Sequence, residues 1–148
     1  VQTCALPIWG DSTKSEYLAY HMWFSTRDMA RIGYLMLRNG KWKQQQIIPS
    51  NWIKTSTSLI TSNKEAVQNK LAYFNFGYGY LWWIWDKPFN TGYYEGAYSA
   101  SGAFGQYITI IPKLDLVIAH KTKAEYGRQT PMDIYLQIID KLLSAKLK

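Results

Sequence analysis

Apolar side chains first recur at helical spacing after residue 25. The stripe consists of Met29, Ile32, Leu35 and Met36, and steps of three and four residues place them on one helix face. Before the stripe, Ser25 and Asp28 form a capping box that favours a helix start. After it, Asn39-Gly40 favours the left-handed conformation that ends a helix. The pattern therefore predicts a helix between Ser25 and Asn39.

Two further helices follow from the same kind of reasoning. A short one is expected from Ser50 to about Ser56, because Pro49 stands near its start. A last one is expected after Thr130-Pro131-Met132-Asp133, a second capping box with proline at the first helical position. Its stripe is Ile134, Ile138 and Leu142. Residues 57–75 are polar and mixed and predict a loop, and residues 9–24 show no regular period.

Four apolar and aromatic runs in the second half of the chain predict strands. They are Tyr78–Trp85, Tyr93–Ser101, Phe104–Ile111 and Leu114–Lys121. Turns are expected at 86–90 and at Pro112-Lys113, and Gly102 and Gly105 indicate a bend or bulge. Connections this short favour antiparallel pairing. We therefore expect an α+β fold, an antiparallel sheet with helices packed on it.

Composition and charge exclude several classes of protein. Hydrophobic residues make up 47% of the 148 and charged residues 18%, which is typical of one folded domain. The net charge of +7 is scattered, so we expect no nucleic-acid partner. Cys4 is the one cysteine and histidines number two, too few for a disulfide framework or a zinc site. No metal or cofactor is expected. No apolar run approaches the roughly 20 residues of a membrane span.

The first eight residues do not look natural. Val1–Ile8 resembles the translated sequence of a common sequencing adapter. We therefore expect residues 1–8 to be non-native, Cys4 to carry no biological information, and residues 9–148 to be the C-terminal part of a larger domain. The alternative is that residues 1–8 are genuine. The chain would then be an intact protein that has lost catalysis and acts as an interaction partner.

The chain has none of the usual patterns of a serine nucleophile. No Ser has Lys three residues later, and no Gly-x-Ser-x-Gly is present. Thr61 and Lys64 have the first spacing, but they lie in the predicted loop. His21 and His120 are the only imidazoles. We expect His21 to have a hydrogen-bonded packing role and His120 to be structural or exposed. No catalytic residue is therefore assigned.

One segment does have a composition suited to a site. Ser99, Ala100, Ser101 and Gly102 are small and lie at a predicted strand bend. Small residues let a ligand approach the backbone, where N–H groups can stabilise an oxyanion. The plainer interpretation is that the glycines only serve a bulge. Residue chemistry alone favours that interpretation.

Several motifs, in order, resemble those of the β-lactamase-related serine hydrolases, which include class C β-lactamases, D-aminopeptidases and related esterases. The matching stretches are Ser25–Leu35, Asn39–Trp42, Ile47–Pro49 with Trp52, Phe76–Trp83 and Ser99–Ile118. The first resembles the family's S-T-x-D-M-A-x-x-G-x-L helix. The last resembles its A-x-G-x-x-G-Q-Y-I strand pair. The resemblance covers roughly residues 17 to 143 and implies an incomplete β-lactamase/transpeptidase-like fold.

The resemblance also implies what is missing. In this family the nucleophilic Ser, its Lys and a later Tyr precede the matched segment. The third motif, Lys-Thr-Gly or His-x-Gly, corresponds to a stretch between Ala97 and Ser101, where no Lys or His stands. Only the backbone role is carried over: an N–H within Ser99–Ser101 as one oxyanion donor. The hydroxyls of Ser99 and Ser101 could also bind a substrate carboxylate or carbonyl.

The function implied is acyl-enzyme hydrolysis of an ester, amide or lactam by the longer protein, with this chain inactive alone. Its partners would be a carbonyl substrate and the missing part of its own domain. Its location would be bacterial and periplasmic or otherwise extracytoplasmic. A rival from another class is a non-catalytic binding module, in which Tyr78–Trp85 and Tyr93-Tyr94 stack on glycans or peptides. An exposed planar row of aromatics would favour the rival, and burial under helices would favour the hydrolase.

Overall fold

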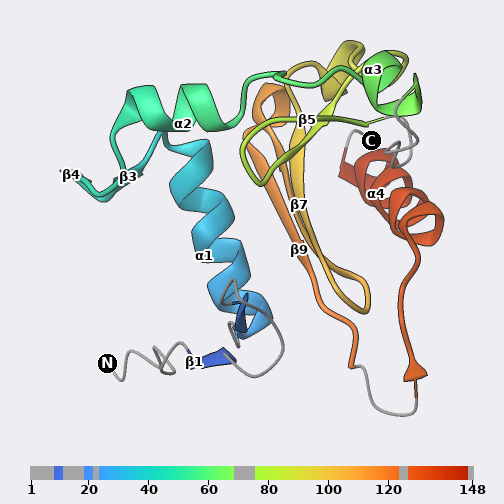
Figure 1. Cartoon of the computed structure of the whole chain (residues 1–148), viewed down its shortest axis with the longest axis horizontal. Coiled ribbons are helices and arrows are strands. Elements are labelled where there is room, and N and C mark those ends of the chain that lie inside the picture. Colours follow the sequence, from blue (N-terminus) through green and yellow to red (C-terminus); the bar gives the residue numbers. More distant parts are fainter. Residues whose placement is uncertain (1–8, 12–18, 22–23, 69–75, 124–126, 147–148) are drawn as a thin grey trace.

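The computed structural model describes residues 9–11, 19–21, 24–68, 76–123 and 127–146 (Figure 1). Its α-helices are α1 (Thr26–Leu37), α2 (Ser50–Ser56), α3 (Asn63–Gln68) and α4 (Met132–Lys146). Short 3-10 helices η1 (Gly92–Tyr94) and η2 (Pro112–Leu114) lie in turns. The strands are β1 (Trp9–Asp11), β2 (Ala19–His21), β3 (Lys41–Trp42), β4 (Gln45–Gln46), β5 (Phe76–Tyr78), β6 (Trp83–Trp85), β7 (Tyr98–Gly102), β8 (Gln106–Ile111) and β9 (Leu116–His120). The adapter-like residues 1–8 lie outside the described part.

A five-stranded antiparallel sheet forms the centre of the molecule. Its strand order is β5-β6-β7-β8-β9, so each strand pairs with its neighbours in sequence. The pairing of β7 with β8 runs from Tyr98 opposite Ile110 to Gly102 opposite Gln106. Among the described strands, β9 forms one edge of this sheet and β5 the other. The predicted α+β class with antiparallel pairing is confirmed.

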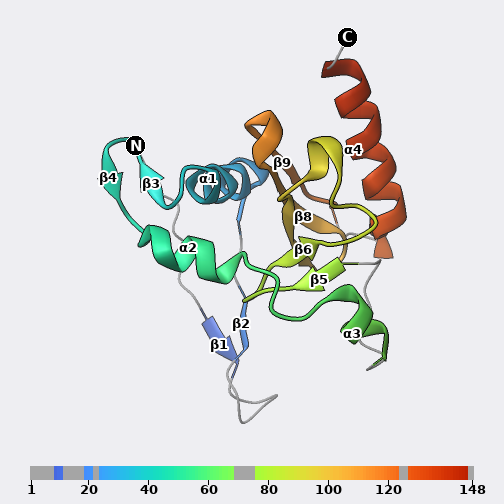
Figure 2. The same cartoon turned by 90° about the horizontal axis from the view of Figure 1, so that it is seen from above.

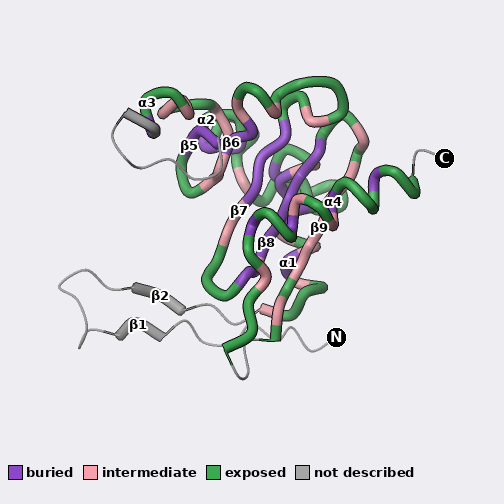
Figure 3. The backbone as a smooth tube through the Cα atoms, turned by 90° about the vertical axis from the view of Figure 1, so that its right-hand side faces the viewer, coloured by how far each residue is buried: buried purple, intermediate pink, exposed green. Residues whose placement is uncertain are grey.

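The two long helices cover opposite faces of the sheet, as Figures 1 and 2 show. On one face α1 buries Met29, Gly33 and Met36. On the other face α4 buries Met132, Tyr135, Ile139 and Leu143. Each helix closes its own apolar cluster against the sheet, and Figure 3 shows burial continuing along β7 and β8 between them. The sheet is therefore the middle of three layers.

The helix α1 forms as its sequence predicts. Ser25 is the N-cap and its hydroxyl accepts from the backbone N–H of Asp28. The side chain of Arg31 then pairs with the Asp28 carboxylate at 2.7 Å. At the other end Asn39 and Gly40 have φ of 53° and 80°, the left-handed geometry expected of a helix stop. The predicted start and end of α1 are therefore confirmed, and so is the predicted helix from Ser50 to Ser56, which is α2.

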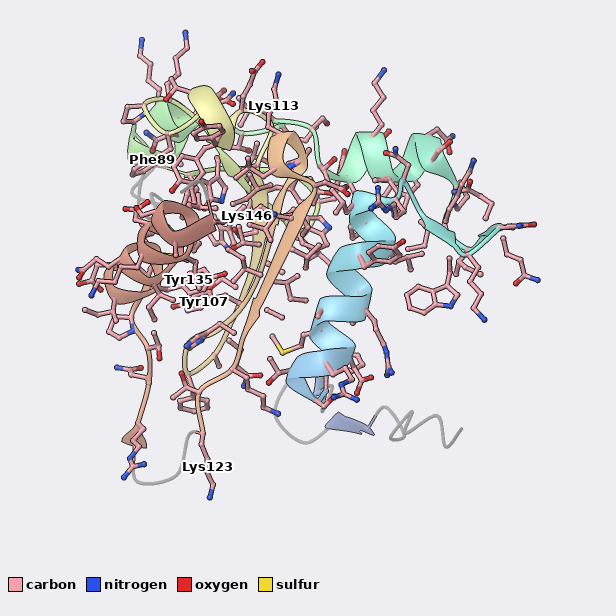
Figure 4. All side chains as sticks on the ribbon, turned by 180° about the vertical axis from the view of Figure 1, so that it is seen from behind. Phe89, Tyr107, Lys113, Lys123, Tyr135 and Lys146 are labelled. Atoms are coloured by element: carbon pink, nitrogen blue, oxygen red, sulfur yellow. The ribbon has the colours of Figure 1, made fainter. Side chains whose placement is uncertain are left out.

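The predicted buried stripe of α4 is wrong. Ile134 and Leu142 are exposed to 44% and 48%, while Tyr135 and Ile139 are fully buried. This helix has apolar residues around more than half of its circumference, so the sequence offers two candidate faces. The aromatic ring of Tyr135 stacks on Tyr107 of β8 with ring centroids 4.1 Å apart (Figure 4). That contact selects the other face.

The segment Tyr78–Trp85, predicted as one strand, is a hairpin of β5 and β6. Leu81 lies at its turn with φ of 65° and is 82% exposed. A side chain on Gly79 would meet the carbonyl oxygens of Ser56 and Ser58 at 2.5 and 2.8 Å, so only glycine fits there. This close approach of α2 breaks the run of aromatics into two strands.

Two more boundaries differ from the prediction. Residues 57–75, predicted as loop, contain α3, while residues 69–75 lie outside the described part. The signal for α3 was a capping box in which Ser62 and Glu65 exchange hydrogen bonds. The strand predicted from Tyr93 begins at Tyr98, because η1 and a turn at Gly96 (φ 75°) precede it. Within 9–24, predicted as irregular, β1 and β2 pair.

Candidate functional site

The predicted site segment lies on β7, at a step in the sheet. The strand β7 pairs with β6 only through Tyr98 and Ser99, whereas it pairs with β8 along its whole length. Ala100, Ser101 and Gly102 therefore extend past the β5–β6 hairpin. Their exposure rises along the strand, from half-buried Ala100 and Ser101 to exposed Gly102. This end of β7 is the accessible part of the predicted segment.

Backbone alternation shows which groups face the side that β6 leaves open. The carbonyl of Ala97 accepts from the Trp85 N–H at 3.0 Å, so the polar groups of Ala97 face β6. Successive residues of an antiparallel strand alternate in direction. Ser99 and Ser101 therefore face the same side as Ala97, and Ala100 faces β8. Of the predicted donors, the Ser101 N–H points to the β6 side of β7 at a position where β6 has already ended.

The hydroxyl of Ser99 has a different role from the one predicted for it. Ser99 is 1% exposed, and its hydroxyl accepts from the Trp85 indole N–H at 2.9 Å. It also contacts the Thr109 hydroxyl at 2.8 Å, which in turn accepts from Tyr135 at 2.8 Å. We call these four residues the Ser99 network. The network lies between the sheet and α4, so the predicted contact of the Ser99 hydroxyl with a substrate does not fit this geometry.

A tight hairpin closes the exposed end of the segment. Gly105 (φ 77°) lies so close to the chain before α4 that a side chain would meet the Thr130 backbone at 2.3 Å. The Gly105 carbonyl is 3.0 Å from Nδ1 of His120. The bend predicted at the glycines is thus a β7–β8 turn, held to the start of α4. His120 has the structural role expected of it.

The other candidates are placed as follows. Thr61 bridges to Tyr78 beside the β5 edge, and its backbone exchanges hydrogen bonds with that residue. Lys64 lies in α3. The side chain of His21 and residue Cys4 lie outside the described residues. Within the described ranges, no group of three or more His, Cys, Asp or Glu could hold a metal ion, and no helix is long and apolar enough to cross a membrane.

The aromatic residues of 78–85 and 93–94, all of them described, do not form an exposed row. Within 78–85 the structure describes every residue, and Tyr80 is the one exposed aromatic there. Its ring stacks on Trp52 of α2 at 5.8 Å. Tyr94 stacks on Trp85 at 4.8 Å, and Tyr93 alone of that pair is exposed. The binding module predicted as a rival would need a planar row, so this arrangement does not favour it.

Burial raises the pKa of one tyrosine in each apolar cluster, Tyr98 and Tyr135. It raises the pKa of Tyr98 to about 12. Burial also raises the pKa of Tyr135, against the opposing effect of its hydrogen bond with Thr109. The phenols of both residues therefore stay protonated at physiological pH and remain hydrogen-bond donors. They supply no base to the segment Ser99–Gly102.

Comparison with known proteins gives one consistent result. A family model named Beta-lactamase matches residues 7–140. An uncharacterized protein of Alkalihalophilus pseudofirmus is 31% identical over 119 residues, which are 75% of this chain and 33% of that protein. A solved structure from Bacillus anthracis, provisionally named a 6-aminohexanoate-dimer hydrolase, is 27% identical with a TM-score of 0.57. The match covers 86% of this chain and 31% of that one.

The chain thus spans about a third of the length of both relatives. The family match agrees with the motif order from Ser25 to Ile118 and with an α+β fold built on an antiparallel sheet. The residues assigned to the site remain predictions. By its sequence and its fold, the chain belongs to the Beta-lactamase family.

Proposed function

We propose that this chain forms one wall of the active site of a serine hydrolase, with the nucleophile supplied by another part of a longer polypeptide. The longer protein would attack an ester, amide or lactam carbonyl and release the acyl group by water. The observation that carries the proposal is the end of β7, where Ala100–Gly102 extend beyond β6. Backbone amides at such a strand end can face the oxyanion of a tetrahedral intermediate.

The sequence itself limits what the chain can do alone. It has no Ser-x-x-Lys and no Gly-x-Ser-x-Gly, and the Ser99 hydroxyl is enclosed between Trp85 and Thr109. A covalent mechanism needs a nucleophile beside a base. We therefore expect the 148-residue chain to be inactive, although it belongs to the Beta-lactamase family and one solved structure that it resembles is named a hydrolase.

The first experiment tests this expectation directly. The purified chain is incubated with a chromogenic cephalosporin, an aryl ester and a fluorophosphonate, and the products are followed by absorbance and by intact mass. We expect no turnover and no adduct. A stoichiometric adduct, or turnover that survives repurification, would show that the chain holds its own nucleophile.

A second experiment tests the longer protein. The genomic DNA upstream of the codon for Trp9 is read, and the complete reading frame is expressed. We expect an in-frame Ser-x-x-Lys and labelling of that serine by the fluorophosphonate. An open reading frame that starts near residue 1 and lacks this motif would overturn the proposal and favour a protein that has lost catalysis.

A further inference from the structure

Figure 1 shows that α2 crosses the C-terminal end of α1. Residues of both helices and of the Tyr98 end of β7 line a cavity beside this crossing. Its volume is about 720 Å³, within the range of small-molecule sites, roughly 300–1,000 Å³. Residues that line it include Met36, Ile53, Lys54, Thr57, Tyr98 and Pro112. The accessible part of the predicted segment, Ala100–Gly102, lies at the other end of the same strand. Nothing in the proposed hydrolysis uses this cavity.

Tyr98, one of the residues that line the cavity, has a hydroxyl without a hydrogen-bond partner among the described residues. Tyr98 is 7% exposed and packs edge-on against Trp82, yet its hydroxyl makes no hydrogen bond with any described residue. Of the described side chains, only Asn63 has a fully enclosed polar atom with no partner. The Tyr98 hydroxyl is therefore not sealed in the core. Tyr98 lines the cavity, so a ligand acceptor bound there can satisfy this hydroxyl.

The rim of the cavity is positive. Lys54 lies in the last turn of α2 and has no ion-pair partner among the described residues. No Asp or Glu is among the residues that line the cavity. The hydroxyl of Thr57 donates to the Ile53 carbonyl at 2.8 Å, so it can only accept from a ligand. The Lys54 ammonium is thus the donor at the rim that favours an anion.

Apolar side chains join these two polar points. Met36 and Ile53 belong to the buried cluster on the α1 face of the sheet, and Pro112 borders the opening. A ligand that reached from Lys54 to Tyr98 would lay an apolar body across them. The Lys54 charge, the apolar side chains and the Tyr98 hydroxyl therefore favour a linear molecule with an anion at one end and a hydrogen-bond acceptor at the other.

We propose that this cavity binds a small amphiphilic carboxylate. Its carboxylate pairs with Lys54, its methylene chain covers Met36 and Ile53, and a carbonyl oxygen at its far end accepts from the Tyr98 hydroxyl. The binding is reversible and involves no covalent step. It does not depend on the hydrolase function proposed above.

The probe is N-acetyl-6-aminohexanoate, which has a carboxylate, five methylenes and an amide carbonyl. Binding to the 148-residue chain is followed by two-dimensional NMR titration, with the signals of Ile53, Thr57 and Gly96 as local reporters. We expect saturable shifts at these residues. Lys54→Met should weaken binding by about tenfold or more, and Tyr98→Phe by roughly fivefold.

Control variants and a control ligand distinguish the proposed contacts of Lys54 and Tyr98 from unspecific effects of charge or stability. Lys64→Met removes an exposed lysine of α3, and Tyr80→Phe removes an exposed phenol; both should bind as the parent chain does. Thermal unfolding must show that each variant is folded. The methylamide of the probe should bind weakly and equally to the parent and to Lys54→Met.

Three results would overturn the proposal. One is the absence of saturable shifts at the reporter residues up to a probe concentration of about 10 mM, where a dissociation constant of 1 mM would give near saturation. The second is equal affinity of the parent chain and both cavity variants. The third is equal affinity for the probe and its methylamide, which would exclude recognition of the carboxylate.

Discussion

Ser99 is a small, buried polar residue whose hydroxyl has two hydrogen-bonding partners. Its hydroxyl links β6, β7 and β8 through Trp85 and Thr109, and Tyr135 joins the network from α4. A buried polar group with partners contributes modestly to stability, but removal of one partner leaves the others without compensation. The network therefore adds side-chain hydrogen bonds between strands that the backbone ladder already pairs.

The variant Ser99→Ala tests this role. It leaves the Trp85 indole N–H without its acceptor and the Thr109 hydroxyl with one partner fewer, so we expect the free energy of unfolding to fall by about 1–3 kcal/mol. Urea unfolding followed by Trp fluorescence measures the change.

The matched control is Ser144→Ala, which removes an exposed hydroxyl from α4. Its effect should stay within about 0.5 kcal/mol. Equal stability of the two variants would show that the Ser99 network contributes nothing measurable.

At the scale of elements, α1 can lie close to the sheet because Gly33 has no side chain. A Cβ on Gly33 would lie 2.4 Å from Val117 Cγ1 and 2.9 Å from Ile108 Cγ2. Both distances are far below van der Waals contact, and both atoms belong to β-branched side chains with stiff rotamers. The glycine therefore allows α1 to lie directly on β8 and β9.

The variant Gly33→Ala sets two effects against each other. Alanine favours a helix over glycine by about 1 kcal/mol, while overpacking in a core destabilises by about 1–3 kcal/mol. Because the nearest contact is so short, we expect overpacking to dominate and the free energy of unfolding to fall.

The double variant Gly33→Ala/Val117→Ala removes the Val117 methyl group that lies nearest to the new Cβ and leaves the contact with Ile108. We expect it to be more stable than the sum of the two single changes predicts, as thermal or urea unfolding would reveal. Additive effects would mean that α1 adjusts without contact between these positions.

At the scale of the whole molecule, β9 lies at a sheet edge within the described part. All five residues of β9 are half-buried, so side chains such as Leu116 and Ile118 remain partly accessible. A strand edge with apolar side chains is a template for pairing with another chain. We expect the 148-residue chain to self-associate through this edge.

Sedimentation velocity over a range of concentrations tests this expectation. The parent chain should show concentration-dependent association, and Ile118→Lys should reduce it by placing a charge on the edge strand. Ile60→Lys, at a 53% exposed position after α2, is the control and should leave association unchanged. A parent chain that stays monomeric and unfolds cooperatively at high concentration would contradict the expectation.

Local signals in the sequence were enough to predict α1, α2, the strand-rich second half and antiparallel pairing. Capping boxes, a left-handed Asn-Gly and short turns act over a few residues, so a single sequence contains them in full. The ordered motifs from Ser25 to Ile118 were likewise sufficient for the family. The capping box of Ser62 and Glu65 is also a local signal and would have predicted α3. The polar composition of residues 57–75 favoured a loop instead, so α3 was not predicted.

Long-range contacts determined the rest. The choice between two apolar faces of α4 depends on Tyr107, which lies 28 positions before Tyr135 and meets it only in the folded chain. The break at Gly79 depends on carbonyls of residues 56 and 58. The enclosure of Ser99 and the position of Tyr98 at a cavity depend on which side of β7 each residue faces. The sequence shows only that Tyr98 and Ser99 are neighbours on one strand. The packing of α1 and α4 on opposite faces of the sheet encloses the Ser99 hydroxyl in a network and leaves Tyr98 lining a cavity.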